Sequence, residues 1–157
     1  MAMHTWFECK IRYEKVMENG MQKKVTEPYL VDALSFTEAE ARIIEEMTPF
    51  ISGEFTVSDI KRANYSELFP SDEESADRWF KCKLIFITLD EKSGAEKKTS
   101  TQVLVQAADL RDAVKKLDEG MKGTMADYQI GMVSETPLMD VYPYSAEPND
   151  KPEFDPS

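Results

Sequence analysis

Two stretches of the sequence combine a tryptophan with basic residues at even spacing, and these residues could bind a ligand that carries both rings and negative charge. They are Trp6, Lys10, Arg12, Trp79, Lys81 and Lys83. In a β-strand, residues at even spacing point to the same face of the sheet. Aromatic rings stack on unpaired bases, and cations follow the phosphates. The pattern therefore predicts a module that binds single-stranded nucleic acid through an aromatic and basic sheet face.

Other interpretations of these residues stay open. Outward Lys and Arg side chains commonly protect sheet edges from aggregation, and each tryptophan opens its strand, where it could close the core instead. The rival function is a protein-interaction or regulatory module that uses the sheet face or an acidic tail. A small-molecule sensor is a third alternative.

The tail, residues 145–157, is acidic and rich in proline, a composition that predicts disorder. Its residues that would contact a protein partner are Glu147, Asp150, Glu153, Phe154 and Asp155. The tail resembles the partner-recruiting tails of single-strand-binding proteins, but it ends in Pro156 and Ser157 and not in an aromatic residue.

The sequence offers little support for catalysis, so we expect a protein that is not an enzyme. His4 is the one histidine, and a catalytic base must be held rigidly beside its nucleophile. The glycine motifs that cradle phosphates are missing. Cys9 and Cys82 lie on the apolar side of predicted strands, which favours core residues over nucleophiles or metal ligands. We therefore expect no cofactor and no metal.

The elements that would position these residues occur twice. Residues 6–11 recur as residues 79–84, and the correspondence continues through a glycine turn, a second strand and a helix to residues 55–70 and 128–143. Single-residue shifts between the copies fall in predicted turns, where insertions are tolerated. The sequence therefore predicts a tandem duplication.

Each copy reads as strand, strand, helix, strand. Alternation of apolar and polar residues from Phe7 to Glu14 predicts a half-buried strand. Ser35 and Glu38 have the spacing of a capping box, and Asp109 takes the place of Ser35 in the second copy. Apolar residues behind both caps recur at helical spacing.

The expected fold class is α+β, with an antiparallel-rich arrangement of six strands in one or two sheets, two helices and pseudo-twofold symmetry. We expect a first repeat at residues 1–70, an acidic linker at 71–78, a second repeat at 79–144 and the tail at 145–157.

The net charge of the chain limits the kinds of partner that it can bind. Lys and Arg number 19 against 30 Asp and Glu, so the formal net charge is −11 and the molecule as a whole should be repelled by nucleic acid and by anionic membranes. Basic residues are concentrated in the predicted strands and their hairpins. No signal peptide and no membrane span are apparent, so we expect a cytoplasmic protein without a membrane partner.

Residues 6–10, 29–33, 35–42, 104–107 and 123–128 resemble an uncharacterised family of bacteria and their phages that is known only as a domain of unknown function, of about 150 residues. The resemblance extends over nearly the whole chain. It implies no activity, ligand or catalytic residue.

Overall fold

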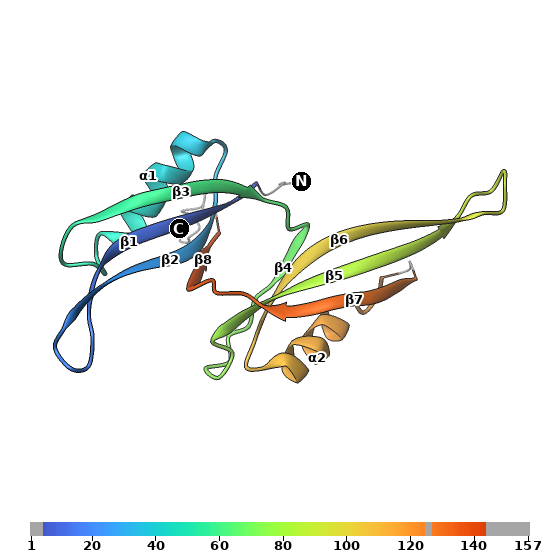
Figure 1. Cartoon of the computed structure of the whole chain (residues 1–157). Helices are drawn as coiled ribbons and strands as arrows, with labels where there is room; N and C mark the ends of the chain where they lie inside the picture. Colours follow the sequence, from blue (N-terminus) through green and yellow to red (C-terminus); the bar gives the residue numbers. More distant parts are fainter. Residues whose placement is uncertain (1–4, 125–126, 144–157) are drawn as a thin grey trace, which may run out of the picture. The chain divides into compact units, whose positions relative to one another are not determined.

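The computed structural model describes residues 5–124 and 127–143. Within these ranges the protein is an α+β structure with two helices and two mostly antiparallel four-stranded sheets (Figure 1). The chain divides into two compact units. Unit 1 contains the described residues up to Ala63 and those from Leu138 onward, and unit 2 runs from Asn64 to Pro137.

Unit 1 contains a sheet with the strand order β3-β1-β2-β8. Its strands are β1 (Trp6–Val16), β2 (Gln22–Asp32), β3 (Phe55–Ala63) and β8 (Asp140–Tyr142). β1 pairs antiparallel with β2 and β3, whereas the short β8 pairs parallel with β2. Gly20 lies in the β1–β2 turn with a φ of 81°, a conformation that glycine adopts without steric cost.

Helix α1 (Phe36–Met47) buries Ala39, Ile43 and Met47 against the inward face of this sheet. Ser35 Oγ accepts a hydrogen bond from the Glu38 N–H, and the Glu38 carboxylate accepts one from the N–H of Leu34. The helix start is therefore capped from both sides, as the serine and glutamate spacing predicts. The strand residues of the core are Phe7, Cys9, Ile11 and Val31.

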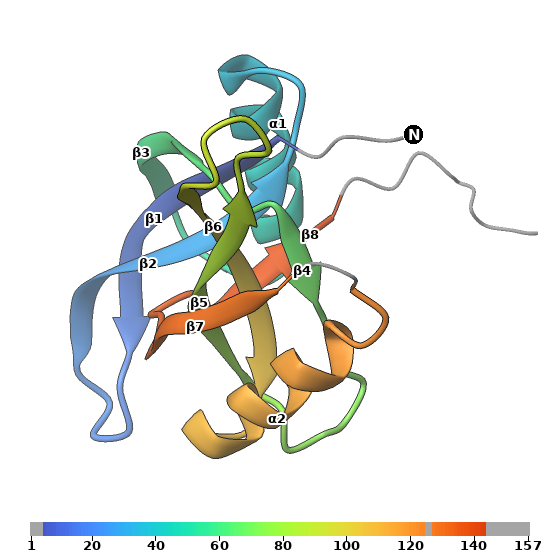
Figure 2. The same ribbon diagram turned by 90° about the vertical axis from the view of Figure 1, so that its right-hand side faces the viewer.

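Unit 2 contains a second sheet with the order β4-β6-β5-β7. Its strands are β4 (Glu67–Phe69), β5 (Arg78–Leu89), β6 (Glu96–Ala107) and β7 (Tyr128–Glu135). Helix α2 (Leu110–Gly120) covers one face, and the β5–β6 hairpin extends beyond it (Figures 1 and 2). Asp109 caps α2 by accepting from the Asp112 N–H at 2.8 Å.

The two units have matching pairing patterns. In each, a long hairpin is joined on one side by the strand that follows the helix and on the other by a three-residue parallel strand. The β1–β3 register shifts between Lys10 and Ile11, and the β5–β7 register shifts between Lys83 and Leu84. These shifts are β-bulges, which twist an edge strand and hinder further pairing.

The strand count differs from the prediction. In place of six strands, the described chain has eight in two sheets, because β4 and β8 were not predicted from the sequence. Each has three residues and pairs with a strand far away in the sequence. Neither length nor local alternation gives such short strands a signal.

The unit boundaries also differ from the predicted repeats. Residues 64–70, expected in the first repeat, belong to unit 2, because β4 pairs with β6. Residues 138–143, expected in the second repeat, belong to unit 1, because β8 pairs with β2. The expected linker at 71–78 lies within unit 2, where Ala76 is 3% exposed and Lys116 Nζ lies 2.7 Å from a Glu73 carboxylate oxygen. The predicted tail at 145–157 lies outside the described residues.

Candidate binding surface on the unit 2 sheet

Both tryptophans lie on the sheet face opposite the helix, but they are not exposed. Trp6 is 3% and Trp79 is 5% exposed, so the expectation that their indoles are available for stacking is wrong. Leu30 shares the face with Trp6, Leu104 shares it with Trp79, and both leucines are fully buried. This end of each face is therefore closed to solvent.

The four predicted basic residues do lie on the faces opposite the helices. Lys10 and Arg12 alternate with inward Cys9 and Ile11 on β1, and Lys81 and Lys83 have the same positions on β5. Arg12 and Lys83 are exposed, and Lys10 and Lys81 are partly buried. Strand parity thus predicted the direction of these side chains correctly, but it did not predict that the tryptophans are buried.

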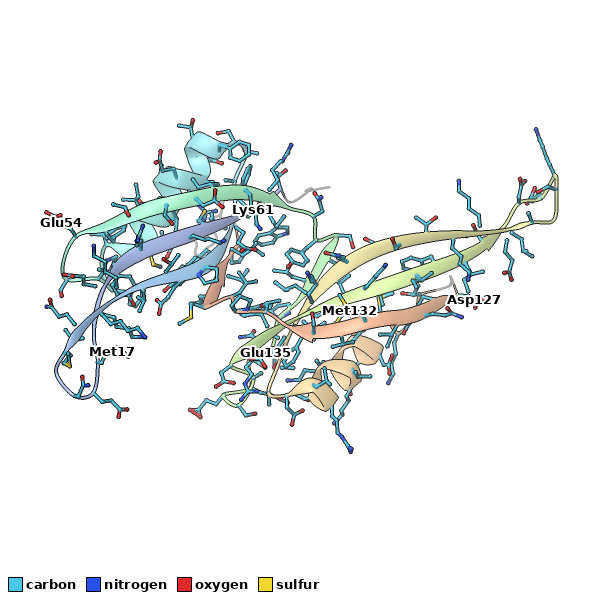
Figure 3. The ribbon with its side chains drawn as sticks, in the orientation of Figure 1. Met17, Glu54, Lys61, Asp127, Met132 and Glu135 are labelled. Atoms are coloured by element: carbon cyan, nitrogen blue, oxygen red, sulfur yellow. The ribbon has the colours of Figure 1, made fainter. Side chains whose placement is uncertain are left out.

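Opposite charges meet on the outer face of the unit 1 sheet. Lys10 lies directly across from Asp59 on β3, and Glu8 lies across from Lys61 on the same strand. Because cross-strand neighbours on one face interact, these charges largely offset one another. Figure 3 shows Lys61 on β3, the edge strand that carries both partners. The unit 1 face is therefore close to neutral.

On the outer face of the unit 2 sheet, no acidic residue among those described lies directly across from the lysines of the paired strands. Lys81 lies across from Ser134 and Leu104, and Lys83 lies across from Met132 and Gln102. Further along the hairpin, Lys98 pairs with Ile87. None of these three lysines forms an ion pair within the described ranges.

Apolar side chains lie among these lysines. Ile85 and Ile87 are partly buried, and Met132 is 42% exposed on β7 (Figure 3). At its hairpin end, two of the described acidic residues border this face: Glu96 lies across from Leu89, and Asp127 lies beside Ile87, whose N–H donates to the Asp127 carbonyl oxygen at 3.2 Å. We call the outward residues Lys81, Lys83, Ile85, Ile87, Lys98 and Met132 the lysine face. An open hollow of about 300 Å³ lies beside it, lined by Asn64, Lys83, Ser100, Thr101 and Gln102.

The apolar part of the lysine face and Lys98 were not predicted from the sequence. A signal was present, because Ile85 and Ile87 continue the outward parity of Lys81 and Lys83. The position of Lys98 beside Ile87, by contrast, depends on the pairing register of β5 and β6. The direction of Met132 depends on the bulge in the β5–β7 pair, because the bulge shifts the alternation of side chains along β7. Simple alternation along the sequence therefore does not predict it.

A second polar cluster occurs on the inward face of unit 1, but its groups satisfy one another. Glu27 accepts hydrogen bonds from Tyr13 at 2.9 Å and from Tyr29 at 3.4 Å, and it lies 3.4 Å from Lys15 Nζ. Burial first, and the Glu27 carboxylate second, raise the pKa of Tyr29 above its usual value. The cluster is therefore a structural network that keeps its tyrosines protonated.

The cysteines are placed for packing. Cys9 and Cys82 are fully buried free thiols, and burial raises the pKa of Cys9 to about 12 and that of Cys82 to about 11. A thiol that stays protonated is a poor nucleophile and a poor metal ligand. In the part of the chain that the structure describes, no group of three or more His, Cys, Asp or Glu side chains is arranged to hold a metal ion.

None of the helices formed by the described residues is long and apolar enough to cross a membrane. Searches of the curated proteins and of the solved structures find no match to the chain. The family model described as Domain of unknown function (DUF4494) matches residues 5–144 and so covers most of the sequence. The chain therefore belongs to the DUF4494 family.

Proposed function

We propose that this protein is a non-enzymatic binding module that holds single-stranded nucleic acid on the lysine face of unit 2. The observation that carries the proposal is the group of cations Lys81, Lys83 and Lys98 on one sheet face, where none of the described acidic residues lies directly across from them, in a chain whose net charge is −11. Cations outside ion pairs remain available to attract phosphate oxygens. Burial of Trp6 and Trp79 removes indole stacking from the mechanism.

In this proposal, the apolar side chains of the lysine face contact the bases, which is the function that the sequence pattern assigned to the indoles. Ile85 and Met132 lie beside Lys83, so a base can rest on aliphatic surface while its phosphate meets the ammonium group. Contact without base-edge hydrogen bonds gives little sequence preference. The expected ligand is therefore a flexible single strand, bound chiefly through its backbone.

The proposal extends to both copies and to their origin. We infer a tandem duplication from the matched strand orders, the matched bulges beside Lys10 and Lys83, and the matched caps Ser35 and Asp109. Binding then distinguishes the copies, since the equivalent face of unit 1 is balanced by Asp59 and Glu8. An experimental structure in which residues 6–70 and 79–143 fail to superpose would contradict the duplication.

A titration of fluorescent oligothymidylate tests the function. Binding should weaken as salt rises, with a log–log slope of roughly −2 if each of three lysines contacts one phosphate. The triple variant Lys81→Gln, Lys83→Gln, Lys98→Gln should abolish this binding. Absence of binding at low salt in the unaltered chain would overturn the proposal.

The matched control is a triple variant on unit 1, Lys10→Gln, Arg12→Gln, Lys61→Gln, which changes the net charge by the same amount. It should bind nearly as well as the unaltered chain, because Lys10 already faces Asp59 and Lys61 already faces Glu8, and only Arg12 lies across from uncharged residues. Equal losses in both triple variants would show that net charge matters and the lysine face does not. Circular dichroism melting curves would establish that both variants fold.

A protein partner is the second candidate, and the exposed Met132 favours it. Methionine beside isoleucine is common on surfaces that adapt to protein ligands. The substitution Met132→Gln separates the candidates, because it should weaken an apolar protein contact much more than binding led by phosphates. We place either activity in the cytoplasm, a location with which the free thiols Cys9 and Cys82 agree. A bacterial or phage source stays a prediction.

A further inference from the structure

We infer that the open hollow beside Lys83 binds the ribose of one nucleotide and makes the lysine face prefer RNA to DNA. This preference rests on the proposed function, because it names the class of single strand that the same face holds. The hollow has a volume of about 300 Å³, and its lining residues all belong to unit 2: Asn64, Lys83, Ser100, Thr101 and Gln102. Small-molecule pockets have volumes of roughly 300–1,000 Å³, so the hollow fits a ligand as small as a pentose.

Strand order places the hollow and the exposed Met132 on opposite sides of Lys83. β5 lies between β6 and β7, so Lys83 has Gln102 across from it on β6 and Met132 across from it on β7 (Figure 3). Ser100 lies across from Ile85 and so points to the same outer face. Neighbouring strands are about 4.8 Å apart, so groups next to a phosphate on Lys83 can reach both sides. Because a phosphate joins two nucleosides, one base can rest on Met132 while the sugar of the other nucleoside lies in the hollow.

The polar side chains of the hollow are available to hydrogen-bond a sugar. Within the described part of the chain, the hydroxyl of Ser100 and the side-chain amides of Asn64 and Gln102 form no hydrogen bond. A serine hydroxyl and a glutamine amide can each donate and accept. The 2′-hydroxyl of ribose is likewise a donor and an acceptor, and DNA lacks it. Ribose therefore gains a hydrogen bond in the hollow that deoxyribose cannot form.

Backbone hydrogen bonds keep the wall of the hollow in place. The Gln102 carbonyl oxygen accepts from the Ser66 N–H at 2.8 Å and from the Ser66 hydroxyl at 3.2 Å. β4 then continues alongside β6, with Glu67 across from Val103. These contacts attach the segment that contains Asn64 to β6. A site that is formed before binding loses less conformational entropy when its ligand arrives.

The test compares fluorescent oligouridylate with oligodeoxyuridylate of the same length, because the two strands differ only in the 2′-hydroxyl. The unaltered chain should bind the RNA strand about fivefold more tightly, which is the effect of one net hydrogen bond. Both affinities should fall as salt rises, since both strands carry the same phosphates. Their ratio should stay constant, because the hydroxyl is uncharged.

Two variants assign the preference to the hollow. The double variant Ser100→Ala, Gln102→Met should lose the preference and keep its affinity for the DNA strand, which also shows that the variant folds. The matched control is Ser134→Ala. It removes a hydroxyl that lies across from Lys81 on the same face, but Ser134 does not line the hollow. The control should keep the RNA preference.

The possible failures are distinguishable. Equal binding of the two strands by the unaltered chain would overturn the RNA preference and leave the proposed function intact. An RNA preference that persists in the double variant, or that is lost in Ser134→Ala, would overturn the assignment to the hollow. Failure of both strands to bind at low salt would refute the proposed function and the preference with it.

Discussion

The two cysteines give each unit a built-in reporter of opening. Cys9 lies in the core of unit 1 and Cys82 in the core of unit 2, and both are 0% exposed. A pKa of about 12 in place of 9.0 reduces the thiolate fraction of Cys9 near neutral pH about 1000-fold, and the pKa of about 11 at Cys82 reduces its fraction about 100-fold. Because reagent cannot reach either sulfur in the folded state, reaction requires opening of the unit.

The assay is modification by an aromatic disulfide reagent, followed by absorbance, in the single-cysteine variants Cys82→Ala and Cys9→Ala. Each remaining thiol should react at least about 1000-fold more slowly in the folded chain than in concentrated guanidinium chloride, since opening of a stable unit is rare. Modification of either folded variant at the rate of the unfolded chain would refute the assignment of both thiols to closed cores.

The same reporters test how β8 connects the units. The chain supplies β8 to unit 1 only after it has passed through unit 2, so loss of unit 2 would leave β8 on a long unfolded loop. Closing such a loop costs chain entropy. The substitution Phe80→Ala, at a buried residue of unit 2, should destabilise that unit by about 3–5 kcal/mol and should speed labelling at Cys9 as well as at Cys82. Unchanged Cys9 labelling would contradict this coupling.

Three further outcomes are expected. Asp109→Ala should lower the free energy of unfolding by about 1 kcal/mol in a denaturant titration, while Asp109→Asn should retain most of the cap. Gly120→Ala should lower the free energy of unfolding by about 1 kcal/mol despite the better helix propensity of alanine, because the new Cβ would lie 2.8 Å from two Phe69 ring atoms. Adding Phe69→Leu to this variant should relieve the clash. Burial raises the pKa of Tyr142 from 10.0 to about 12. The contribution of the protonated tyrosine to the free energy of unfolding should therefore be fully present below about pH 10 and should be lost as the pH rises toward 12. The melting temperature measures this loss, and an increase in melting temperature over this interval would contradict it.

Local patterns in the sequence predicted the elements well. Alternation around Phe7 and Phe80 placed the central strands, and the caps at Ser35 and Asp109 placed the helices, because each signal depends only on neighbouring residues. The direction of Lys81 and Lys83 followed from the same alternation. These features required no knowledge of distant contacts.

By itself, the sequence determined the order of long strands and helices, which face of β1 and β5 is polar, and an acidic chain with cations on its sheets. The tertiary structure alone decided that β4 completes unit 2 and β8 completes unit 1, that Trp6 and Trp79 are buried, and that Lys98 and Met132 join Lys83. The physical reason is the range of the interactions. Strand parity and capping act between neighbours in the chain, whereas burial, cross-strand register and the pairing of three-residue strands depend on residues brought together only when the chain has folded.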